Sequence, residues 1–117
     1  MADDPRLHYL GELDGRLPDG AKVLELGCGA GDPCSKKLAE RHDVLGVDLS
    51  RRQVELARAN VPQARFEKAD MTALDLPEAT FDGVVAFYSI LHVPRAEQPA
   101  LIAEIARWLK PDGLFPA

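Results

Sequence analysis

Cysteine is scarce in this sequence, and its scarcity excludes two classes of protein. Only Cys28 and Cys34 occur among the 117 residues, too few and too closely spaced for a small secreted domain held by disulfides. The sequence also lacks the Cys-x-x-Cys and His-x-x-x-His spacings that commonly bind zinc. We therefore expect two reduced thiols in a cytoplasmic protein, and no metal site.

Long apolar runs and clusters of basic residues are missing as well. No run approaches the roughly 20 residues needed to cross a bilayer, and the segment from Met1 to Arg6 has the character of neither a signal peptide nor a transit peptide. The 14 Lys and Arg residues are outnumbered by 19 Asp and Glu residues, which gives a formal net charge of -5. Neither a membrane nor nucleic acid is therefore expected as a partner.

The composition is that of a folded domain. Hydrophobic residues make up 46% of the chain and charged residues 28%, as in soluble globular proteins and unlike disordered tails. The sequence contains no internal repeat and no low-complexity segment. Residues 1–117 are therefore expected to form a single domain, which buries roughly two-thirds of the surface of the unfolded chain.

Short apolar runs alternate with helical periodicity along the chain. The pattern predicts helices at residues 6–17, 33–41, 50–60 and 99–109. It predicts strands at residues 22–26, 44–47, 64–68 and 83–87, and a further strand that begins at 114–115. Such alternation indicates an α/β fold with right-handed crossovers and a parallel sheet. Ligands of these sheets bind beyond the carboxyl ends of the strands.

A glycine-rich loop follows the first predicted strand. It reads Gly27-Cys28-Gly29-Ala30-Gly31, and glycines permit a tight turn in which a ligand can approach bare backbone. A turn that needed glycine only for its dihedral angles would require one. Three glycines at alternate positions therefore favour a ligand-binding loop.

Acidic residues follow the next two predicted strands. Asp48 lies 21 residues beyond Gly27, where a carboxylate can accept hydrogen bonds from both hydroxyls of a ribose. Asp48 could alternatively be the N-cap of the next helix, but Ser50 is already available for that role. Asp70 and Met71 suit an adenine, although a turn Asp and a core Met explain this pair equally well.

The residues that the loop lacks limit which ligands it can bind. A dinucleotide-binding loop would have glycine at position 32, where Asp32 stands, and the Gly-Lys-Ser/Thr of a P-loop is absent. A nicotinamide-dependent oxidoreductase is therefore disfavoured. The acidic residues Glu25, Asp48 and Asp70 fall on one side of the expected site and favour a positive ligand. The residues together predict a cationic adenosine without phosphates.

These segments resemble those of the class I S-adenosylmethionine-dependent methyltransferases. The resemblance covers roughly residues 7 to 115 and rests on five segments in the family's order: 23–31, 46–50, 69–71, 81–85 and 109–114. It implies a three-layer α/β/α sandwich with a parallel sheet of strand order 3-2-1-4-5. In this arrangement a Rossmann-like core at 21–117 follows an N-terminal helix at 6–17.

The resemblance also implies how S-adenosylmethionine would be held. The glycine loop would face the methionine moiety, with Glu25 near its ammonium group. Asp48 would bind the ribose hydroxyls, and Asp70 would bind the adenine amino group. The remaining expected cofactor-binding residues are Tyr9, Gly27, Cys28, Gly29, Gly31, Leu49, Met71 and Phe87.

Methyl transfer requires mainly that the two reactants be aligned, and a general base is needed only if the acceptor loses a proton. His92 is a candidate base, although a role in capping or packing the connection to the last helix is favoured over this one. Tyr88 shapes the acceptor pocket or covers the sheet. The chain is thus expected to be a methyltransferase for a small-molecule acceptor or, alternatively, a truncated cofactor-binding core without catalytic activity of its own.

Two departures from the family pattern concern the end of the chain. Asp112 stands where the family usually has the first glycine of Lys-Pro-Gly-Gly, and we expect it to strain or shift that turn. The antiparallel strand pair that completes the family's sheet is not found. We therefore expect an open apolar edge at Leu114 and Phe115. Either the chain forms a homo-oligomer through this edge, or it is a marginally stable monomer.

Overall fold

The structure, a computed structural model, describes residues 11, 13, 15–31, 34–86 and 93–115. Its strands are β1 (Lys22–Leu26), β2 (Asp43–Asp48), β3 (Arg65–Lys68), β4 (Phe81–Val85) and β5 (Leu109–Leu114). Its helices are α2 (Cys34–Leu38), α3 (Arg51–Asn60) and α4 (Gln98–Trp108), with 3₁₀ turns η1 (Met71–Ala73) and η3 (Arg95–Glu97). Within the described residues, no helix combines the length and the apolar character needed to span a bilayer.

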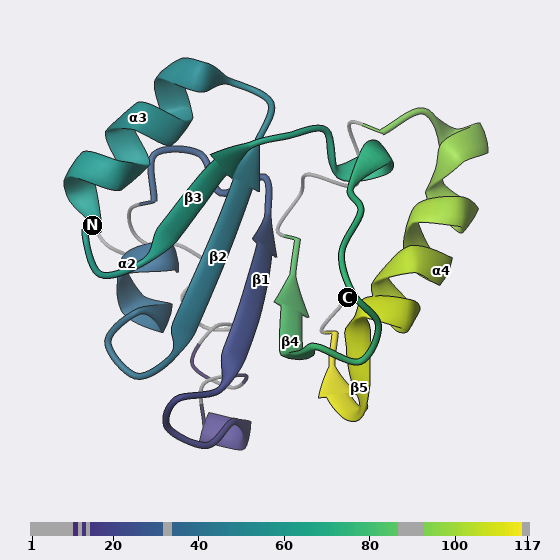
Figure 1. Cartoon of the computed structure of the whole chain (residues 1–117), viewed down its shortest axis with the longest axis horizontal. Coiled ribbons are helices and arrows are strands. Elements are labelled where there is room, and N and C mark those ends of the chain that lie inside the picture. The colour runs from purple at the N-terminus through teal and green to yellow at the C-terminus, as the bar shows by residue number, and fades with distance from the viewer. Residues whose placement is uncertain (1–10, 12, 14, 32–33, 87–92, 116–117) are drawn as a thin grey trace.

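The five strands form one sheet in the order β3-β2-β1-β4-β5, and every neighbouring pair is parallel (Figure 1). The predicted strand order and the predicted parallel sheet are therefore confirmed. The carboxyl ends of β1, β2 and β3 meet at one edge of this sheet. The segments that follow these strands are consequently neighbours in space.

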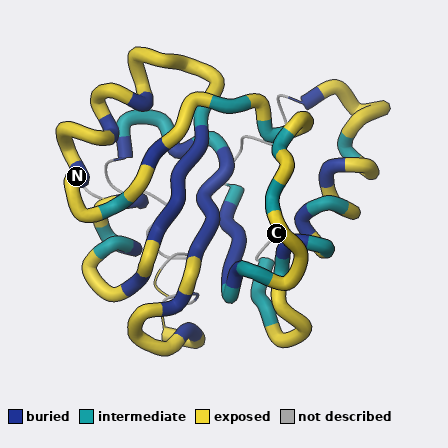
Figure 2. Tube along the Cα trace, viewed as in Figure 1, coloured by how far each residue is buried: buried dark blue, intermediate teal, exposed yellow. Residues whose placement is uncertain are grey.

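The sheet is covered on both faces, so its central strands β1, β2 and β4 are mostly apolar and buried. Leu24 and Leu26 pack with α4 on one face, whereas Val23 packs with α2 and with Leu17 on the other. A separate cluster lies beneath α3. The trace of β1, β2 and β4 is accordingly buried, whereas the outer turns of the helices are exposed (Figure 2). These three layers are the predicted α/β/α sandwich.

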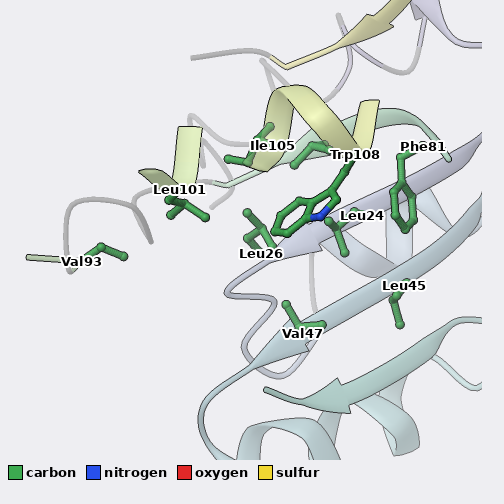
Figure 3. Close-up of a cluster of buried hydrophobic side chains, with 10 residues drawn as sticks. Leu24, Leu26, Leu45, Val47, Phe81, Val93, Leu101, Ile105 and Trp108 are labelled. Atoms are coloured by element: carbon green, nitrogen blue, oxygen red, sulfur yellow. The ribbon is translucent and has the colours of Figure 1, made fainter. Parts of the chain in front are cut away.

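Trp108 is the largest side chain of the core, and it fixes α4 on the sheet. It is fully buried and packs with Leu24 and Leu26 of β1 and with Leu101 and Ile105 of its own helix (Figure 3). The buried residues of α4, Leu101, Ile105 and Trp108, follow helical spacing and therefore form one apolar face that packs on the sheet. The position of α4 then determines where the residues of η3, directly before it, stand.

Helix α3 begins and ends where the sequence indicates. The Ser50 side chain accepts a hydrogen bond from the Gln53 amide (3.3 Å), which caps the helix, and Val54 and Ala57 are buried. The second helix is shorter than predicted, because α2 ends at Leu38. The next residues form tighter turns, and Arg41 there bonds to Asp19 (2.6 Å).

The N-terminal helix and the fourth strand are described only in part. Gly11, Leu13, Gly15 and Arg16 are helical, and Leu13 is buried against the sheet; residues 1–10 lie outside the described residues. Strand β4 begins at Phe81, two residues before the predicted start. The predicted end of this strand, Phe87, also lies outside the described residues.

The last strand corrects the sequence prediction. We expected Lys110 to Gly113 to form a turn before a strand, but β5 begins at Leu109, directly after α4. It pairs with β4 at Leu109 and again at Leu114, and the register is irregular between these positions. Pro111 is the physical reason, because it has no N–H for a regular ladder, and a bulge accommodates it.

The expectation that Asp112 strains this segment is not supported. Among the described residues other than glycine, positive φ occurs only at Ala79. The glycine that the bulge needs is Gly113, where a Cβ would lie 2.8 Å from Leu109 Cδ2. Leu114 and Phe115 are half-buried against the two core clusters, so the edge exposes less apolar surface than expected.

Gly46 gives a test of packing between β2 and β3. A Cβ at this position would lie 2.7 Å from Phe66 Cδ1 and 2.9 Å from Cys28 Cβ, so Gly46→Ala is expected to destabilise the fold by about 1–3 kcal/mol. The control is Gly11→Ala, because Gly11 is helical and has nothing within 4 Å of an added Cβ. That variant should gain up to about 1 kcal/mol. Thermal unfolding measures both, and equal midpoints for the two variants would contradict this account.

Candidate functional site

A pocket of about 310 Å³ lies beyond the carboxyl ends of β1, β2 and β3. Its walls come from the segments that follow these strands and from the segment that leads into α4. It is lined by Gly27, Val47, Asp48, Leu49, Ala69, Asp70, Met71, Thr72, Val93, Pro94 and Glu97. The position agrees with the general rule that parallel sheets bind ligands at this edge.

The pocket brings together five of the residues singled out from the sequence, namely Gly27, Asp48, Leu49, Asp70 and Met71. A second set of predicted residues lies outside its lining: Glu25, Cys28, Gly29 and Gly31. The remaining predicted site residues fall outside the described residues: Tyr9, Phe87, Tyr88 and His92.

Asp48 joins the glycine loop to the start of α3. Its Oδ2 accepts the Gly29 amide (2.9 Å), and its Oδ1 accepts the Ser50 amide (2.9 Å). A carboxylate has about four lone-pair sites, so each oxygen keeps one acceptor position for a ligand. Asp48 therefore shapes the loop and can still accept hydrogen bonds from a diol in the pocket.

The glycines of the loop are required by its backbone conformation. Gly27, Gly29 and Gly31 all have positive φ, at 70°, 57° and 85°, a region that other residues rarely adopt. Dihedral angles alone thus account for all three glycines. The inference that one glycine would suffice for the turn is therefore wrong, and the number of glycines is no argument for a ligand; that the loop binds one stays a prediction.

The amides of this loop are used within the chain. Gly27 and Cys28 both donate to the Val47 carbonyl (2.8 and 3.0 Å), and Gly31 donates to the Cys28 carbonyl (3.2 Å). The Gly29 amide is held by Asp48. These four donors are therefore already satisfied, although the sequence had suggested bare backbone that a ligand could approach. The loop is consequently a poor cradle for a phosphate, which binds through free amides.

Helix α3 supports the far side of the loop. The Asn60 side-chain amide donates to the Ala30 carbonyl (3.0 Å). A Cβ on Gly31 would lie 3.0 Å from Val61 Cγ2 and 3.3 Å from Ala57 Cβ. Gly31 is thus required both for its dihedral angles and for close packing on α3.

Glu25 lies behind the loop in a buried position. It is 4% exposed, and its Oε1 accepts a hydrogen bond from the hydroxyl of Ser35, which is fully buried at the start of α2. A buried carboxylate needs such partners. The expected contact between Glu25 and a ligand ammonium group stays a prediction.

The Cys28 thiol shows the sign of the electrostatic potential around the loop. Burial and the negative charges of Glu25 and Asp48 raise its pKa to about 12. The thiolate is disfavoured because burial removes water from it and because it would be a third negative charge beside these two carboxylates. The same potential favours a positively charged ligand.

Asp70 forms a turn and also lines the pocket. Its Oδ1 accepts both the Thr72 amide (2.9 Å) and the Thr72 hydroxyl (2.6 Å), which caps η1. These two bonds lower the pKa of Asp70, so the group is an acceptor at neutral pH. Its Oδ2 makes no hydrogen bond with the described residues and remains available.

Leu49 and Met71 are two of the apolar residues that line the pocket. Leu49 is 64% exposed, the largest exposure among the bulky hydrophobic residues identified as exposed. Met71 is half-buried against the core under α4. Flat apolar groups such as an adenine ring pack on side chains of this kind.

Six residues of the pocket were not predicted as site residues: Val47, Ala69, Thr72, Val93, Pro94 and Glu97. Thr72 and Pro94 follow strand ends, so the rule that ligands bind there could have included them. Glu97 belongs to η3 and reaches the pocket only because α4 packs on the sheet. No signal in the sequence places it there.

Among the described residues, no group of three or more His, Cys, Asp or Glu side chains could hold a metal ion. The polar side chains in the lining of the pocket are those of Asp48, Asp70, Thr72 and Glu97.

Comparison with known proteins identifies the family. The model of a methyltransferase domain family matches residues 23–113. Phosphoethanolamine N-methyltransferase 1 of Triticum aestivum is 39% identical over 111 residues, covering 90% of this chain and 21% of the relative. The 27-O-demethylrifamycin SV methyltransferase of Amycolatopsis mediterranei is 37% identical over 111 residues, covering 86% of this chain and 40% of the relative.

A solved structure agrees with these matches. CalS10, an amino pentose methyltransferase from Micromonospora echinaspora solved with bound S-adenosylmethionine, superposes with a TM-score of 0.81 at 30% identity. The match covers 96% of this chain and 48% of CalS10. This chain spans between 20% and 40% of the length of the curated relatives that it matches. With the predicted motifs, the strand order and these matches in agreement, the chain belongs to the class I S-adenosylmethionine-dependent methyltransferases.

Proposed function

We propose that this chain binds S-adenosylmethionine in the pocket beyond β1, β2 and β3 and serves methyl transfer to a small-molecule acceptor. The observation that carries the proposal is the convergence of Asp48, Leu49, Asp70 and Met71 on one pocket of about 310 Å³. These residues come from two neighbouring strand ends, and each has the chemistry that one part of an adenosine requires.

The residues fit an adenosine in a definite orientation. The two free acceptor positions of Asp48 suit the ribose hydroxyls, and Oδ2 of Asp70 suits the adenine amino group. Leu49 and Met71 would then pack on the base. The glycine loop, which begins at Gly27 in the pocket wall, would lie along the methionine moiety, with Glu25 and Gly31 behind it.

The charge of the site suits a cationic cofactor. Four amides of the loop are already bonded within the chain, and Glu25 and Asp48 make the surrounding potential negative. When bound, S-adenosylmethionine supplies a methyl group on a positively charged sulfur. The contribution of this chain is to bind and orient the cofactor, and orientation alone can lower a barrier by about 7–11 kcal/mol in favourable cases.

The acceptor is proposed from the relatives. Phosphoethanolamine and demethylrifamycin, named for the relatives in Triticum aestivum and Amycolatopsis mediterranei, are both small molecules. We propose an acceptor of this class, with Tyr88 in the acceptor pocket wall and His92 as the base where a proton must leave. The alternative is a cofactor-binding core that transfers nothing by itself, and a turnover assay with radiolabelled cofactor separates the two.

Replacement of Asp48 tests the cofactor site. Asp48→Ala is expected to abolish the calorimetric heat of binding of S-adenosylmethionine or its demethylated product. Asp48→Asn should weaken binding about 30-fold, because one charged hydrogen bond contributes about 2 kcal/mol.

The matched control is Asp43→Asn. Asp43 lies at the opposite end of the same strand, is exposed, and pairs with Arg65 (3.4 Å). It undergoes the same change of charge and should bind like the parent chain. Unchanged binding in Asp48→Ala would remove Asp48 from the site.

Cys28 gives a test of the negative potential. Because its pKa is about 12, compared with 9.0 for an ordinary thiol, alkylation by iodoacetamide should keep rising about tenfold per pH unit from about pH 8 to pH 10. Peptide mass mapping separates Cys28 from Cys34. In urea the Cys28 rate should level off near the ordinary pKa. A plateau near pH 9 in the folded protein would show that burial and the two carboxylates do not raise the pKa of this thiol.

Self-association through β5 is the last part of the proposal. In the described residues β5 pairs only with β4, which leaves one of its edges open to a second copy of the chain. Sedimentation should therefore show a mass that increases with concentration. A stable monomer over a wide range of concentration would argue against it.

A further inference from the structure

A second hollow, of about 320 Å³, lies between α3 and the end of β3 and is not part of the cofactor pocket. Its lining is Arg51, Val54, Glu55, Arg58 and Lys68. The four residues of α3 are spaced as i, i+3, i+4 and i+7, so they share one face of the helix, and Lys68 is the last residue of β3. The packing of α3 on β3 therefore gathers these side chains.

The hollow is basic in a chain that is otherwise acidic. Its lining has three cationic side chains and one carboxylate, that of Glu55, a local charge of +2 against -5 for the whole chain. These three basic residues are spread over 18 positions of the sequence, so they do not form a basic cluster that sequence analysis could recognise. Like charges held together favour binding of an anion.

The three cationic side chains differ in how many hydrogen bonds they make with the rest of the chain. Arg58 donates from Nε and Nη2 to the Phe66 carbonyl (3.3 and 2.8 Å), which fixes its guanidinium and leaves Nη1 unused by the described residues. The side chains of Arg51 and Lys68 make no ion pair or hydrogen bond with the described residues. One fixed guanidinium beside two uncommitted cations is an arrangement that suits a phosphate group.

The hollow adjoins the cofactor pocket through two short segments. Arg51 follows Ser50, whose amide is held by Asp48. Lys68 pairs in register with Asp48 and is followed by Ala69 and Asp70, which line the pocket. An anion that joined Arg51 to Lys68 would fix the spacing between the ends of β2 and β3, where Leu49 and Asp70 face the expected adenine.

We propose that the hollow of Arg51, Arg58 and Lys68 binds a small phosphate-bearing anion, and that its occupation strengthens cofactor binding in the adjoining pocket. The anion site itself does not depend on the proposed function, whereas its effect on cofactor affinity rests on it. Coupling between two sites is reciprocal, so bound cofactor strengthens anion binding by the same factor.

The first experiment titrates inorganic phosphate, at constant ionic strength set with chloride, into the full chain while amide resonances are recorded. Saturable shifts should centre on the residues of the hollow. The variant Arg51→Gln with Lys68→Gln should lose them. The control variant, Arg52→Gln with Lys36→Gln, removes the same charge from exposed positions outside the hollow and should keep them.

Glycerol 3-phosphate in place of phosphate identifies the source of the group. Tighter binding of the ester indicates a phosphorylated metabolite, and tighter binding of phosphate indicates the free ion; both support the site. The absence of saturable shifts with either probe, or equal loss in the two variants, would overturn it. Binding of heparin alone would also overturn it, because the surface would then be a face for long polyanions.

The second experiment measures the affinity for S-adenosylhomocysteine with and without phosphate. We expect phosphate to tighten binding about fivefold in the parent chain, near the lower end of usual coupling between sites, and to have no effect in Arg51→Gln with Lys68→Gln. Cofactor binding that phosphate leaves unchanged would refute the coupling. Phosphate binding by a chain that binds no cofactor would refute the proposed function and leave the anion site standing.

Discussion

The carboxylate of Asp48 is the interaction on which the binding edge of this molecule depends. It takes one amide from the glycine loop and one from the turn that begins α3. Two segments that follow different strands are thereby joined at a single side chain. Because both amides are satisfied by a group that also lines the pocket, the structural role of Asp48 and its proposed role toward the ribose reinforce each other.

The surroundings of the loop explain why its chemistry differs from that of a phosphate loop. Its amides are turned inward to Val47, Cys28 and Asp48, while the buried Glu25 lies behind it with Ser35 as partner. The loop therefore has few free N–H donors for an anion, and the nearby carboxylates of Glu25 and Asp48 make its surroundings negative. A phosphate group is instead favoured in the hollow between α3 and the end of β3, where Arg51 and Lys68 lie, so the two sides of the β2–α3 turn have opposite charge preferences.

Much of the fold could be predicted from the sequence, because the central strands β1, β2 and β4 are mostly apolar and residues with a clear local role follow or end them. Gly27 and Asp48 mark such ends, and Ser50 marks the start of α3. The rest depends on packing that the sequence does not display. The bulge of β5 arises because Pro111 has no N–H to donate to the neighbouring strand. Glu97 reaches the pocket because the burial of Trp108 fixes α4, and with it η3, on the sheet. Only the structure shows that all three loop glycines adopt positive φ. Only the structure shows that the packing of α3 on β3 brings Lys68 beside Arg51 and Arg58.

Leu109 closes α4 and also opens β5, with no residue between the helix and the strand. Any residue inserted there would rotate Trp108 out of the core or move Leu109 away from Phe81. Length variation among related chains should therefore avoid this junction. It should accumulate in the irregular segment 74–80, where most side chains face solvent and added residues displace little.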